Sequence, residues 1–435
     1  MVAEHFAAHV ATRQRRAEAV LAAAGYDAYV VSSGKPSTHY ADDMDAPFHS
    51  VPHFAHWLPL DGPHHLLHVQ SGKRARVVRY APEDYWYEQL PLADAFWRGH
   101  FDVSEVPDVA KTWKALTLRG KTAYLGDEPE LARAAGIAES DINPAELVAR
   151  LDWERAYKTA YEVACIEVAE TLGAQGHRAA LAAFEEGASE LAIHNEYLAA
   201  VGCTEEQLPY HTIIALDHKG ATLHYTGKRT VGDGRVLLID CGAEYLGYGS
   251  DITRTWTRKG CDATFHELVK GVDALQQRLC ARVRPGIAYL ELHAAAHDEI
   301  ANLLHGLGVL KKSGREAVEL GLTRPFFPHG LGHFLGIQVH DVGGRQKAPE
   351  GGTLAPPAMY PYLRTTRKVE DHQVFTIEPG VYFIEMLLRD YRKGALAQHF
   401  DWPLIERMSA FGGVRVEDDV LVTADGHRNL TRPHI

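Results

Sequence analysis

The pattern of apolar residues changes near position 155, and this change limits the possible folds more than any other feature of the sequence. Before it, short alternating segments that predict strands are interleaved with helical segments, beginning with a helix over 4–24 that ends at Gly25. From 145 to 184 the pattern is strongly helical, and long strand segments follow. We therefore predict two domains, a mixed α/β domain over 1–155 and a larger domain over 156–435.

The order of the predicted elements indicates the fold class. In the first domain we predict strands over 27–33, 53–60, 64–70, 74–80 and 122–127, and helices over 109–118 and 129–136. In the second domain we predict strands over 210–225, 235–258, 336–342, 372–383 and 412–423, and helices over 263–283 and 288–306. Strand pairs with helices between them predict an α+β fold, with helices packed on one face of an antiparallel sheet.

Charge and cysteine content exclude several classes of protein. With 45 basic and 57 acidic residues the net charge is −12, which disfavours binding to nucleic acid. No apolar run approaches the roughly 18 residues of a transmembrane helix, and charged residues throughout 1–25 exclude a signal peptide. The 5 cysteines form no CxxC pair, which fits a reducing compartment. We predict a cytoplasmic protein without nucleic-acid or membrane partners.

Two aspartates flank a predicted hairpin within LLIDCGAEYLGYGSDITRTW. Asp240 ends a buried apolar strand, Asp251 begins the next, and both are equally far from a turn within Glu244–Gly247. In a regular antiparallel hairpin this symmetry places them opposite each other, with both side chains on one face. Two carboxylates that close repel unless one is protonated or a cation lies between them. The alternative is that both face solvent, since aspartate is common near turns.

Three histidines, His329, His333 and His340, occur within PHGLGHFLGIQVHDVGG. The glycines between them allow close approach of the backbone, as at a ligand site. A single histidine is more often a structural or surface group, but three in a glycine-rich apolar segment favour a metal or substrate site. The spacing of the glycines does not fit the dinucleotide-binding fingerprint.

Two further acidic residues follow predicted strands. Glu378 closes the apolar strand of VFTIEPGVYF before the turn pair Pro379-Gly380, and a charged group at the end of a buried strand needs a partner. In GGVRVEDDVLV, period-two alternation places Arg415 and Glu417 on one face. An alternative explanation for that pair is a salt bridge on an exposed face.

Together these segments supply two aspartates, two glutamates and at least one histidine. Ligation dominated by carboxylates, with one imidazole, suits divalent ions such as Mn²⁺, with Co²⁺ or Zn²⁺ as alternatives. Five protein ligands exceed the need of one catalytic ion. Two metals that share bridging carboxylates are therefore the economical interpretation.

The ordered set Asp240, Asp251, His333, Glu378 and Glu417 resembles the ligands of the pita-bread metallopeptidases, the family of methionine aminopeptidase, aminopeptidase P and prolidase. The segments PHGLGHFLGIQVHD, LHYT at 223–226, TIEPGVYF, GGVRVED and DDMDAPFHSVPHFAHWLPL are similar to those of its bacterial prolidases (Xaa-Pro dipeptidases). The likeness spans nearly the whole chain. It implies a C-terminal pita-bread catalytic domain and a smaller creatinase/prolidase-like N-terminal domain. Creatinase has this fold without the ligands, so their presence argues against it.

The resemblance also implies a role for each site residue. Asp240 would bind the first metal, His333 and Glu378 the second, and Asp251 and Glu417 would bridge the two. A hydroxide between the metals would attack the scissile carbonyl, with Glu378 as general base. The other residues would contact the substrate: His224 and His340 at the scissile carbonyl, His329 and Arg415 on the proline side, and Tyr210 as a polarising group.

The resemblance further implies a homodimer that cleaves Xaa-Pro dipeptides. An N-terminal loop over 42–58, with Asp45 and Phe48, would reach the partner's site and exclude long chains. One alternative is an aminopeptidase P that cleaves longer Xaa-Pro peptides, and hydrolysis of organophosphorus triesters is another. Outside enzymes, the alternative is a catalytically silent peptide-binding homologue, although such proteins usually lose ligands that this chain retains.

Overall fold

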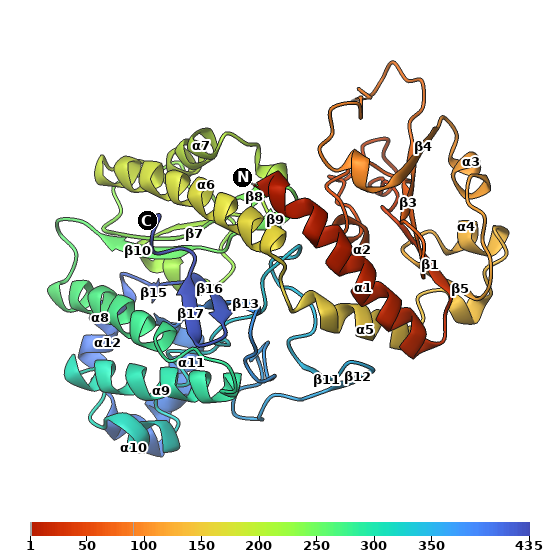
Figure 1. Cartoon of the computed structure of the whole chain (residues 1–435). Helices are drawn as coiled ribbons and strands as arrows, with labels where there is room; N and C mark the ends of the chain where they lie inside the picture. The colour runs from red at the N-terminus through yellow and green to blue at the C-terminus, as the bar shows by residue number, and fades with distance from the viewer. Residues whose placement is uncertain (1, 90) are drawn as a thin grey trace. The chain divides into compact units, whose positions relative to one another are not determined.

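The computed structural model of the chain describes residues 2–89 and 91–435. The chain forms two compact units (Figure 1). Unit 1 contains Met1–Cys165 together with the short segment Lys347–Gly352, and unit 2 contains Ile166–Gln346 and Thr353–Ile435. The chain therefore contributes to unit 1 twice.

Unit 1 is built on a five-stranded sheet in the order β4-β3-β2-β1-β5. β1 pairs antiparallel with β2 and parallel with β5, and β3 pairs antiparallel with β2 and parallel with β4. The strands are β1 (Ala28–Ser32), β2 (Leu66–Gln70), β3 (Arg76–Tyr80), β4 (Asp102–Val106) and β5 (Thr122–Leu125). The helices are η1 (Val2–His5), α1 (Phe6–Ala24), α2 (Pro52–Ala55), η2 (Arg98–His100), α3 (Val109–Lys114), α4 (Pro129–Ala134), η3 (Glu139–Asp141) and α5 (Ala145–Arg155).

Most of the predicted elements of unit 1 are present, with two exceptions. The predicted strand over 53–60 is wrong, because the segment begins as α2 and buries Phe54, Trp57 and Leu58. That spacing of three and four residues is helical, and Pro52 is tolerated in a first turn. β4 is missing from the prediction because this edge strand has no fully buried residue and so gives no apolar signal.

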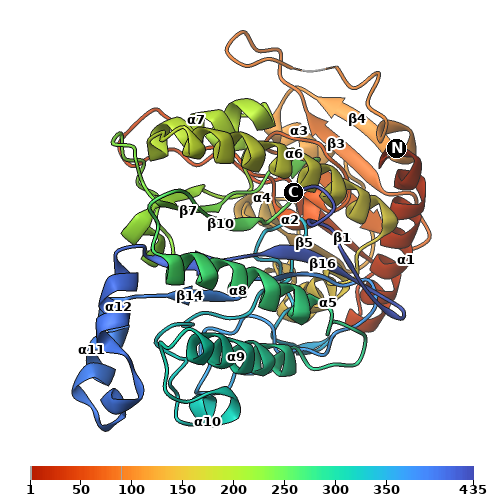
Figure 2. The ribbon, with the colours of Figure 1, turned by 90° about the vertical axis from the view of Figure 1, so that its left-hand side faces the viewer.

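Unit 2 contains most of the long helices of the chain. The predicted helical stretch over 145–184 is interrupted at 156–159, between α5 and α6 (Ala160–Glu185). The others are α7 (Glu190–Val201), η4 (Glu205–Gln207), η5 (Asp217–Ala221), α8 (Ala263–Cys280), α9 (Tyr289–Gly306), α10 (Gly314–Glu319), α11 (Glu385–Lys393), η6 (Ala395–His399) and α12 (Trp402–Ser409). Figures 1 and 2 show α8 running beside α9, against which it packs.

Short antiparallel sheets form the β part of unit 2. β6 (Ile213–Leu216), β7 (Val236–Asp240) and β10 (Thr253–Thr257) form one sheet in the order β10-β7-β6. β13 (Val374–Ile377), β16 (Asp418–Thr423) and β17 (Gly426–Asn429) form another. Smaller pairs of unit 2 are β8 (Glu244–Tyr245) with β9 (Tyr248–Gly249) and β14 (Gly380–Tyr382) with β15 (Gly413–Arg415). β11 (Gln346–Ala348) pairs with β12 (Gly351–Thr353), and most of this pair lies in the segment Lys347–Gly352 that belongs to unit 1. The antiparallel α+β prediction is confirmed, and the domain has the pita-bread fold.

The two faces of the β10-β7-β6 sheet have different surroundings. α6 and α7 cover the face that carries Ile214, Leu237 and Ile239, and these residues share one hydrophobic cluster with both helices. The opposite face carries Leu238 in a second cluster that includes Tyr382. Asp240 lies two residues after Leu238 and therefore points to this second face. The helices thus leave one face of the sheet to the polar site.

Two predicted strand segments of unit 2 differ in the structure. Residues 336–342 form no strand; their backbone turns back so that the Asp341 N–H donates to the Phe334 carbonyl. Residues 210–225 form a strand only over β6, and η5 follows directly. None of the described helices has the length and apolar character needed to cross a membrane.

Candidate metal centre

Asp240 and Asp251 lie at one end of the pairing between β7 and β10. Asp240 is opposite Thr253, and the same register continues to Glu244 opposite Gly249. Asp251 is therefore diagonal to Asp240, and the predicted direct pairing is wrong. Both side chains still point to one face, since residues two apart on a strand do so. They are 9% and 4% exposed, which rules out the solvent-facing alternative.

The turn between β8 and β9 sets this register. Leu246 and Gly247 have φ values of 51° and 87°, as in the two-residue hairpin turns with both central residues left-handed. Close to the site, the strands approach so tightly that a Cβ atom on Gly242 would lie 1.9 Å from the Ser250 carbonyl oxygen. A glycine at 242 is therefore a requirement of the hairpin that holds the two aspartates.

His333 reaches the site from a different segment, through close contact with β13. Its N–H donates to Thr376 Oγ1 at 3.2 Å, and the Thr376 N–H donates to the His333 carbonyl at 2.9 Å. A Cβ atom on Gly332 would lie 2.1 Å from the Thr376 carbonyl oxygen. The predicted close backbone approach in this glycine-rich segment is thus confirmed at Gly332.

The His333 imidazole points toward the predicted carboxylates. Its Nδ1 lies 3.0 Å from the Phe334 carbonyl, and donation there leaves Nε2 free to bind a cation. Nε2 lies 3.3 Å from Asp251 Oδ2 and 3.7 Å from Glu378 Oε1. Asp251, His333 and Glu417 are all buried, and each offers a ligand atom within 4.8 Å of the others.

Arg415 provides the positive charge next to Asp240. Its Nη2 donates to Asp240 Oδ2 at 2.6 Å, its Nη1 to Tyr382 Oη at 2.8 Å and its Nε to Thr253 Oγ1 at 3.2 Å. The Thr253 hydroxyl donates to Glu417 Oε2 at 2.6 Å. Arg415 and Glu417 are 4% and 2% exposed, so a salt bridge on an exposed face is not the explanation for this pair.

Carboxylates outnumber cationic groups in this acidic centre, which consists of Asp240, Asp251, His333, Glu378 and Glu417. Burial raises the pKa of Glu378 to about 7, although His333 and Arg415 oppose the shift. Burial and the charge of Asp251 raise the pKa of Glu417 well above its usual value. Burial also raises the pKa of Asp240 against the effect of Arg415. Without cations, these groups can meet their charge surplus only by holding protons.

These residues fit divalent metal ions. Asp240 Oδ1 is buried and has no hydrogen-bond partner among the described residues, which is costly unless a ligand completes the site. Four carboxylates and one imidazole with a free Nε2 match the donor preference of hard and borderline divalent ions. Bound cations would also neutralise the surplus negative charge.

The predicted substrate residues His329 and Tyr210 border the acidic centre. His329 Nδ1 lies 2.8 Å from the Gly330 carbonyl and 3.5 Å from Glu378 Oε2. Burial and the charge of Arg415 lower the pKa of His329 to about 3, so its imidazole is neutral. The Tyr210 hydroxyl is buried, and burial together with the charges of nearby aspartates raises its pKa well above the usual value. Tyr210 is therefore a neutral O–H donor.

His340 and His224 are both exposed. The His340 ring stands perpendicular to the His333 ring, with 4.3 Å between the ring centroids. A charge on His224 would lower the pKa of both His329 and His340, which places it within electrostatic range of them. The structure thus places His340 beside the acidic centre and His224 within electrostatic range of His329 and His340.

Comparison with known proteins identifies the family. Residues 164–424 match the model of metallopeptidase family M24, and residues 4–153 match that of the Xaa-Pro dipeptidase N-terminal domain. The chain belongs to metallopeptidase family M24. M24 membership agrees with the acidic centre, since the family consists of metal-dependent peptidases.

Similar proteins extend over almost the full length of this M24 chain. An Xaa-Pro dipeptidase of Stenotrophomonas maltophilia (strain R551-3) is 43% identical over 98% of this chain and 96% of its own. One from Klebsiella pneumoniae is 41% identical over 98% of this chain and 97% of its own. Among solved structures, aminopeptidase P II from Yersinia pestis aligns with 100% of this chain and 97% of its own, at a TM-score of 0.75 and 23% identity. At that identity the structural likeness supports the fold alone.

Two residues of the M24 site are absent from the sequence prediction. Thr253 links Arg415 to Glu417 through its hydroxyl, and Tyr382 Oη lies 2.9 Å from His329 Nε2 while it accepts from Arg415. Neither residue type is distinctive in a strand. Only their positions in the sequence could have indicated them, since Tyr382 follows the turn after Glu378 and Thr253 follows Asp251 by two residues.

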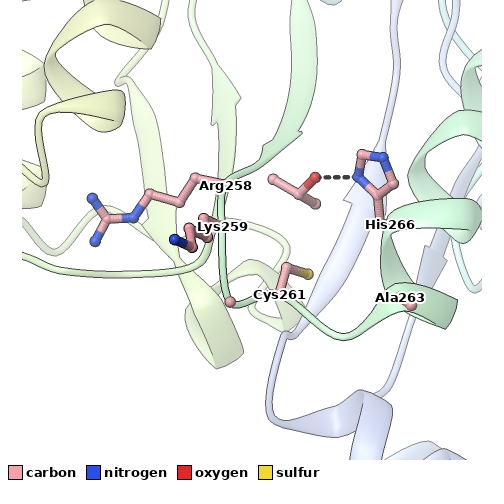
Figure 3. Close-up of a pocket in the computed structure, with 7 residues that line it drawn as sticks. Arg258, Lys259, Cys261, Ala263 and His266 are labelled. Atoms are coloured by element: carbon pink, nitrogen blue, oxygen red, sulfur yellow. Dashed lines mark hydrogen bonds between the residues drawn. The ribbon is translucent and has the colours of Figure 1, made fainter.

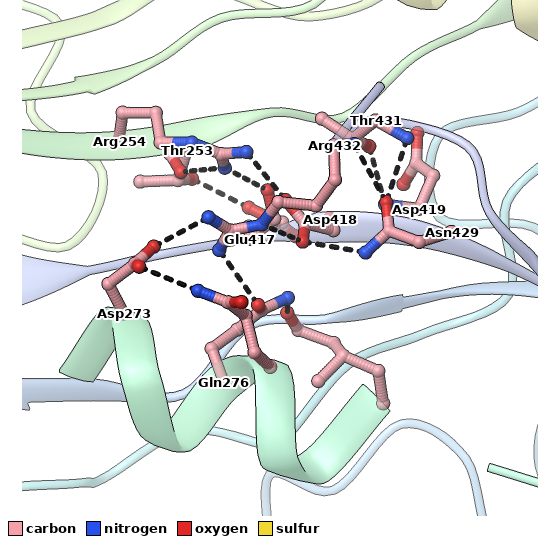
Figure 4. A network of polar contacts seen from close by, with 12 residues as sticks. Thr253, Arg254, Asp273, Gln276, Glu417, Asp418, Asp419, Asn429, Thr431 and Arg432 are labelled. Carbon is pink, nitrogen blue, oxygen red and sulfur yellow. Dashed lines mark hydrogen bonds and ion pairs between the residues drawn. The ribbon is translucent and has the colours of Figure 1, made fainter. Parts of the chain in front are cut away.

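A second polar cluster, the arginine network, lies next to Glu417 (Figure 4). It consists of Arg254, Asp418, Asn429 and Arg432. Arg254 Nη2 donates to Asp418 Oδ1 at 2.7 Å, and Arg432 Nε and Asn429 Nδ2 donate to Asp418 Oδ2 at 2.7 and 2.8 Å. Arg254 Nη1 also donates to the Glu417 carbonyl at 2.7 Å. The network therefore fixes the backbone that carries Glu417.

A surface pocket of about 320 Å³ lies at the start of α8 (Figure 3). It is lined by Thr257, Arg258, Lys259, Gly260, Cys261, Ala263 and His266. The Thr257 hydroxyl lies 2.5 Å from His266 Nδ1. The lining contains no carboxylate and none of the acidic-centre residues, so this pocket is not the M24 site.

Proposed function

We propose that the chain is a cytoplasmic Xaa-Pro dipeptidase that uses two divalent metal ions per subunit, preferably Mn²⁺. The observation that carries the proposal is a buried trio of ligands, Asp251, His333 and Glu417, in a chain 43% identical to an Xaa-Pro dipeptidase over 98% of its length. The excess of oxygen donors supports Mn²⁺ over softer ions. Five free cysteines support a reducing compartment.

In this proposal each ligand has a separate task. Asp240 would hold one metal, His333 and Glu378 would hold the other, and Asp251 and Glu417 would serve both. Bound divalent cations would polarise the scissile carbonyl and lower the pKa of the attacking water. Arg415 orients Asp240 through the 2.6 Å hydrogen bond, and the Phe334 carbonyl keeps the proton of His333 on Nδ1.

The remaining polar groups act on the substrate. Glu378 accepts the proton of the attacking water and delivers it to the leaving proline nitrogen. His224 and His340 donate to the oxygen of the scissile carbonyl as negative charge develops on it, and Tyr210 polarises the same group. Both histidines are exposed and are therefore accessible to a substrate, which supports contact with it.

His329 and Arg415 line the proline side of the substrate. Arg415 Nη1 and Nη2 each keep a second N–H beyond those given to Tyr382 and Asp240, and these can bind the proline carboxylate. An Xaa-Pro amide lacks an N–H, so strand-like recognition of the substrate backbone cannot use it. Metal ions held by the acidic centre would supply contacts to the amine and the carbonyl in its place.

We assign domain 1–155 to dimerisation and to the control of substrate length. Residues 42–50 are exposed or half-buried, and Asp45 Oδ1 accepts from the Thr38 hydroxyl at 2.8 Å. The proposed function of the loop over 42–50 is to bring Asp45 and Phe48 near the metal site of the partner subunit. The later part of the predicted loop is not a loop, since α2 begins at Pro52.

The proposal is tested by turnover of metal-loaded enzyme on Xaa-Pro dipeptides, Xaa-Pro-Yaa tripeptides and a phosphotriester. Dipeptides should be cleaved with the highest kcat/KM. Faster cleavage of tripeptides would favour an aminopeptidase P, and a preference for the phosphotriester would favour a triesterase. Full metal content without any hydrolysis would favour a silent peptide-binding protein.

The role of the 42–50 loop is tested separately by shortening it. Activity on tripeptides should rise relative to dipeptides, because the obstruction is steric. Metal content serves as the control and should stay unchanged. An unaltered dipeptide-to-tripeptide ratio would remove the basis for this assignment.

A further inference from the structure

The segment that carries His224 has little regular structure of its own. After η5, residues 222–235 form no helix or strand before β7 begins. His224 is exposed, whereas its neighbours Leu223 and Tyr225 pack against the hydrophobic cluster that contains Tyr382. Another part of the fold must therefore hold His224 in place, because an exposed side chain on an irregular segment is otherwise free to move.

Glu190, the first residue of α7, binds this segment on both sides of Thr226–Lys228. Its Oε2 accepts from the Tyr225 hydroxyl at 2.8 Å and from the Arg229 N–H at 2.8 Å. Its Oε1 accepts from Arg229 Nε at 2.9 Å and from the N–H of Leu216, the last residue of β6, at 3.0 Å. The Glu190 side chain is fully buried.

The bonds of Glu190 are of the strong kind. Each joins an ionised carboxylate to a donor, and such bonds are roughly twice as strong as those between neutral groups. The pKa of Glu190 lies below its usual value because, although burial opposes ionisation, Arg229 and the N–H donors stabilise the charge. The N–H of Leu191 also donates to the Arg229 carbonyl at 3.1 Å. One helix start therefore anchors the segment through both side chain and backbone.

We propose that Glu190 is a positioning residue for catalysis, which holds His224 against the scissile carbonyl by fixing the neighbouring Tyr225 and, further along, Arg229. This inference rests on the proposed role of His224. Tyr225 joins the two functions because it packs against the hydrophobic cluster that contains Tyr382, whose hydroxyl contacts His329 and Arg415, while its own hydroxyl binds Glu190. Lys228 adds a second tie, since its Nζ donates to the Thr212 carbonyl at 2.9 Å.

Two variants test the inference, Tyr225→Phe and Glu190→Gln. Tyr225→Phe removes one hydroxyl and keeps the ring on its cluster, so it should fold normally and lower kcat about threefold to tenfold. Glu190→Gln weakens the whole anchor, and we expect a loss in kcat of about 10- to 100-fold. KM and metal content should change little, because His224 acts on the carbonyl in the transition state. Tyr391→Phe is the matched control, since that hydroxyl donates to the Gly321 carbonyl and to no site segment.

A double-mutant cycle with His224→Ala decides the mechanism. In the His224→Ala background, Tyr225→Phe and Glu190→Gln should change kcat by less than about twofold, because the group they position is gone. The inference is overturned if the effects of these variants on kcat multiply with that of His224→Ala. It is also overturned if KM or metal content changes while kcat does not. In both cases the proposed function stands. If His224→Ala itself leaves kcat unchanged, the proposed role of His224 fails, and this inference fails with it.

Discussion

Glu417 and Asp418 follow each other in the chain and are equally buried, yet their carboxyl groups have opposite charge environments. Glu417 belongs to the acidic centre, where burial and the charge of Asp251 raise its pKa well above the usual value. Asp418 belongs to the arginine network, where Arg254 and Arg432 outweigh burial and lower its pKa. Adjacent residues at the start of a strand point to opposite faces, so one backbone serves both regions.

The difference shows which property distinguishes the acidic centre from the arginine network that supports it. Glu417 and Asp418 are both buried, so burial alone does not mark function. The arginine network matches its carboxylate with two guanidinium groups and one amide, all within 2.8 Å. Among the described residues, the acidic centre has four carboxylates, with Arg415 and His333 as their contacting counter-charges. A buried region that the protein leaves short of positive charge is a region prepared for cations.

Removal of metal should produce the largest contrast between the two regions. Prolonged chelation should abolish dipeptide hydrolysis, and Mn²⁺ should restore it, because only the acidic centre depends on added cations. Elemental analysis and circular dichroism before and after chelation provide the measurement, with the fold retained. Full activity in a preparation shown to be free of metal would contradict the proposed two-metal centre.

The variant Glu417→Gln should have the second-largest effect on activity. It keeps the shape of the side chain but removes a charge that the two proposed cations would share. We expect loss of at least one metal per chain and a fall in turnover of about 10³-fold or more, comparable with loss of an essential catalytic group. Metal content and kcat are measured on the same preparation. Two metals and normal turnover would show that Glu417 does not bridge.

His340→Ala tests a group that touches the acidic centre without belonging to it. As the proposed donor to the developing oxyanion, His340 should contribute about 10²- to 10³-fold to turnover, the scale for one such donor. Metal occupancy should remain near wild type, since its ring only packs against that of His333. Loss of metal in this variant would mean that His340 is a ligand.

Asp418→Asn should affect stability and leave the chemistry nearly intact. It removes the charge between Arg254 and Arg432, and breaking a buried pair of this kind costs about 3–5 kcal/mol of unfolding free energy. Chemical denaturation measures this loss, and kcat per metal-loaded molecule should stay within about tenfold of wild type. A variant as inactive as Glu417→Gln would remove the distinction between site and support.

The pH dependence of the metal-free protein should give the smallest effect. The pKa of Glu378 is raised from 4.5 to about 7, so the folded protein holds the Glu378 proton more tightly than the unfolded chain does. The free energy of unfolding therefore contains this contribution in full below pH 4.5 and loses it as the pH rises to about 7. The loss should be about 1.4 kcal/mol per pH unit for one proton. Asp418 has the opposite pH dependence. Because its pKa is lowered, its contribution to the free energy of unfolding is lost only as the pH falls below 3.8.

Denaturation of metal-free protein at pH 5 and pH 7 measures this effect. Glu378→Gln should reduce the slope of the profile between these values without removing it, because Glu170 also has a pKa raised to about 7, while Asp418→Asn should leave the slope unchanged. Equal slopes in wild type and Glu378→Gln would contradict the assignment of the titrating group.

Much of the fold and the acidic centre could be predicted from the sequence, for identifiable reasons. Long periodic segments predicted α1, α8 and α9 closely, and acidic residues at the ends of apolar strands drew attention to Asp240 and Glu378. The strand prediction over 53–60 failed because α2 is only four residues long. The edge strand β4 lacked an apolar face.

The finer geometry of the site could not be predicted. The hairpin register depends on a left-handed Leu246, and leucine gives none of the signal that Asn-Gly or Asp-Gly would give. Thr253 and Tyr382 are common strand residues, and only the packing of β7, β10, β14 and β15 brings their hydroxyls to Arg415. Residues that connect groups far apart in sequence leave no local pattern.

The short segment Lys347–Gly352 has a consequence for biosynthesis. It belongs to unit 1, yet it follows Cys165 by 347 − 165 = 182 positions. A ribosome adds roughly 5–20 residues per second, so unit 1 waits on the order of 10–40 s for its last piece. During that interval unit 1 is incomplete and can aggregate, while much of unit 2 is still being synthesised. Codon choice between these positions therefore bears on how much active enzyme a cell obtains.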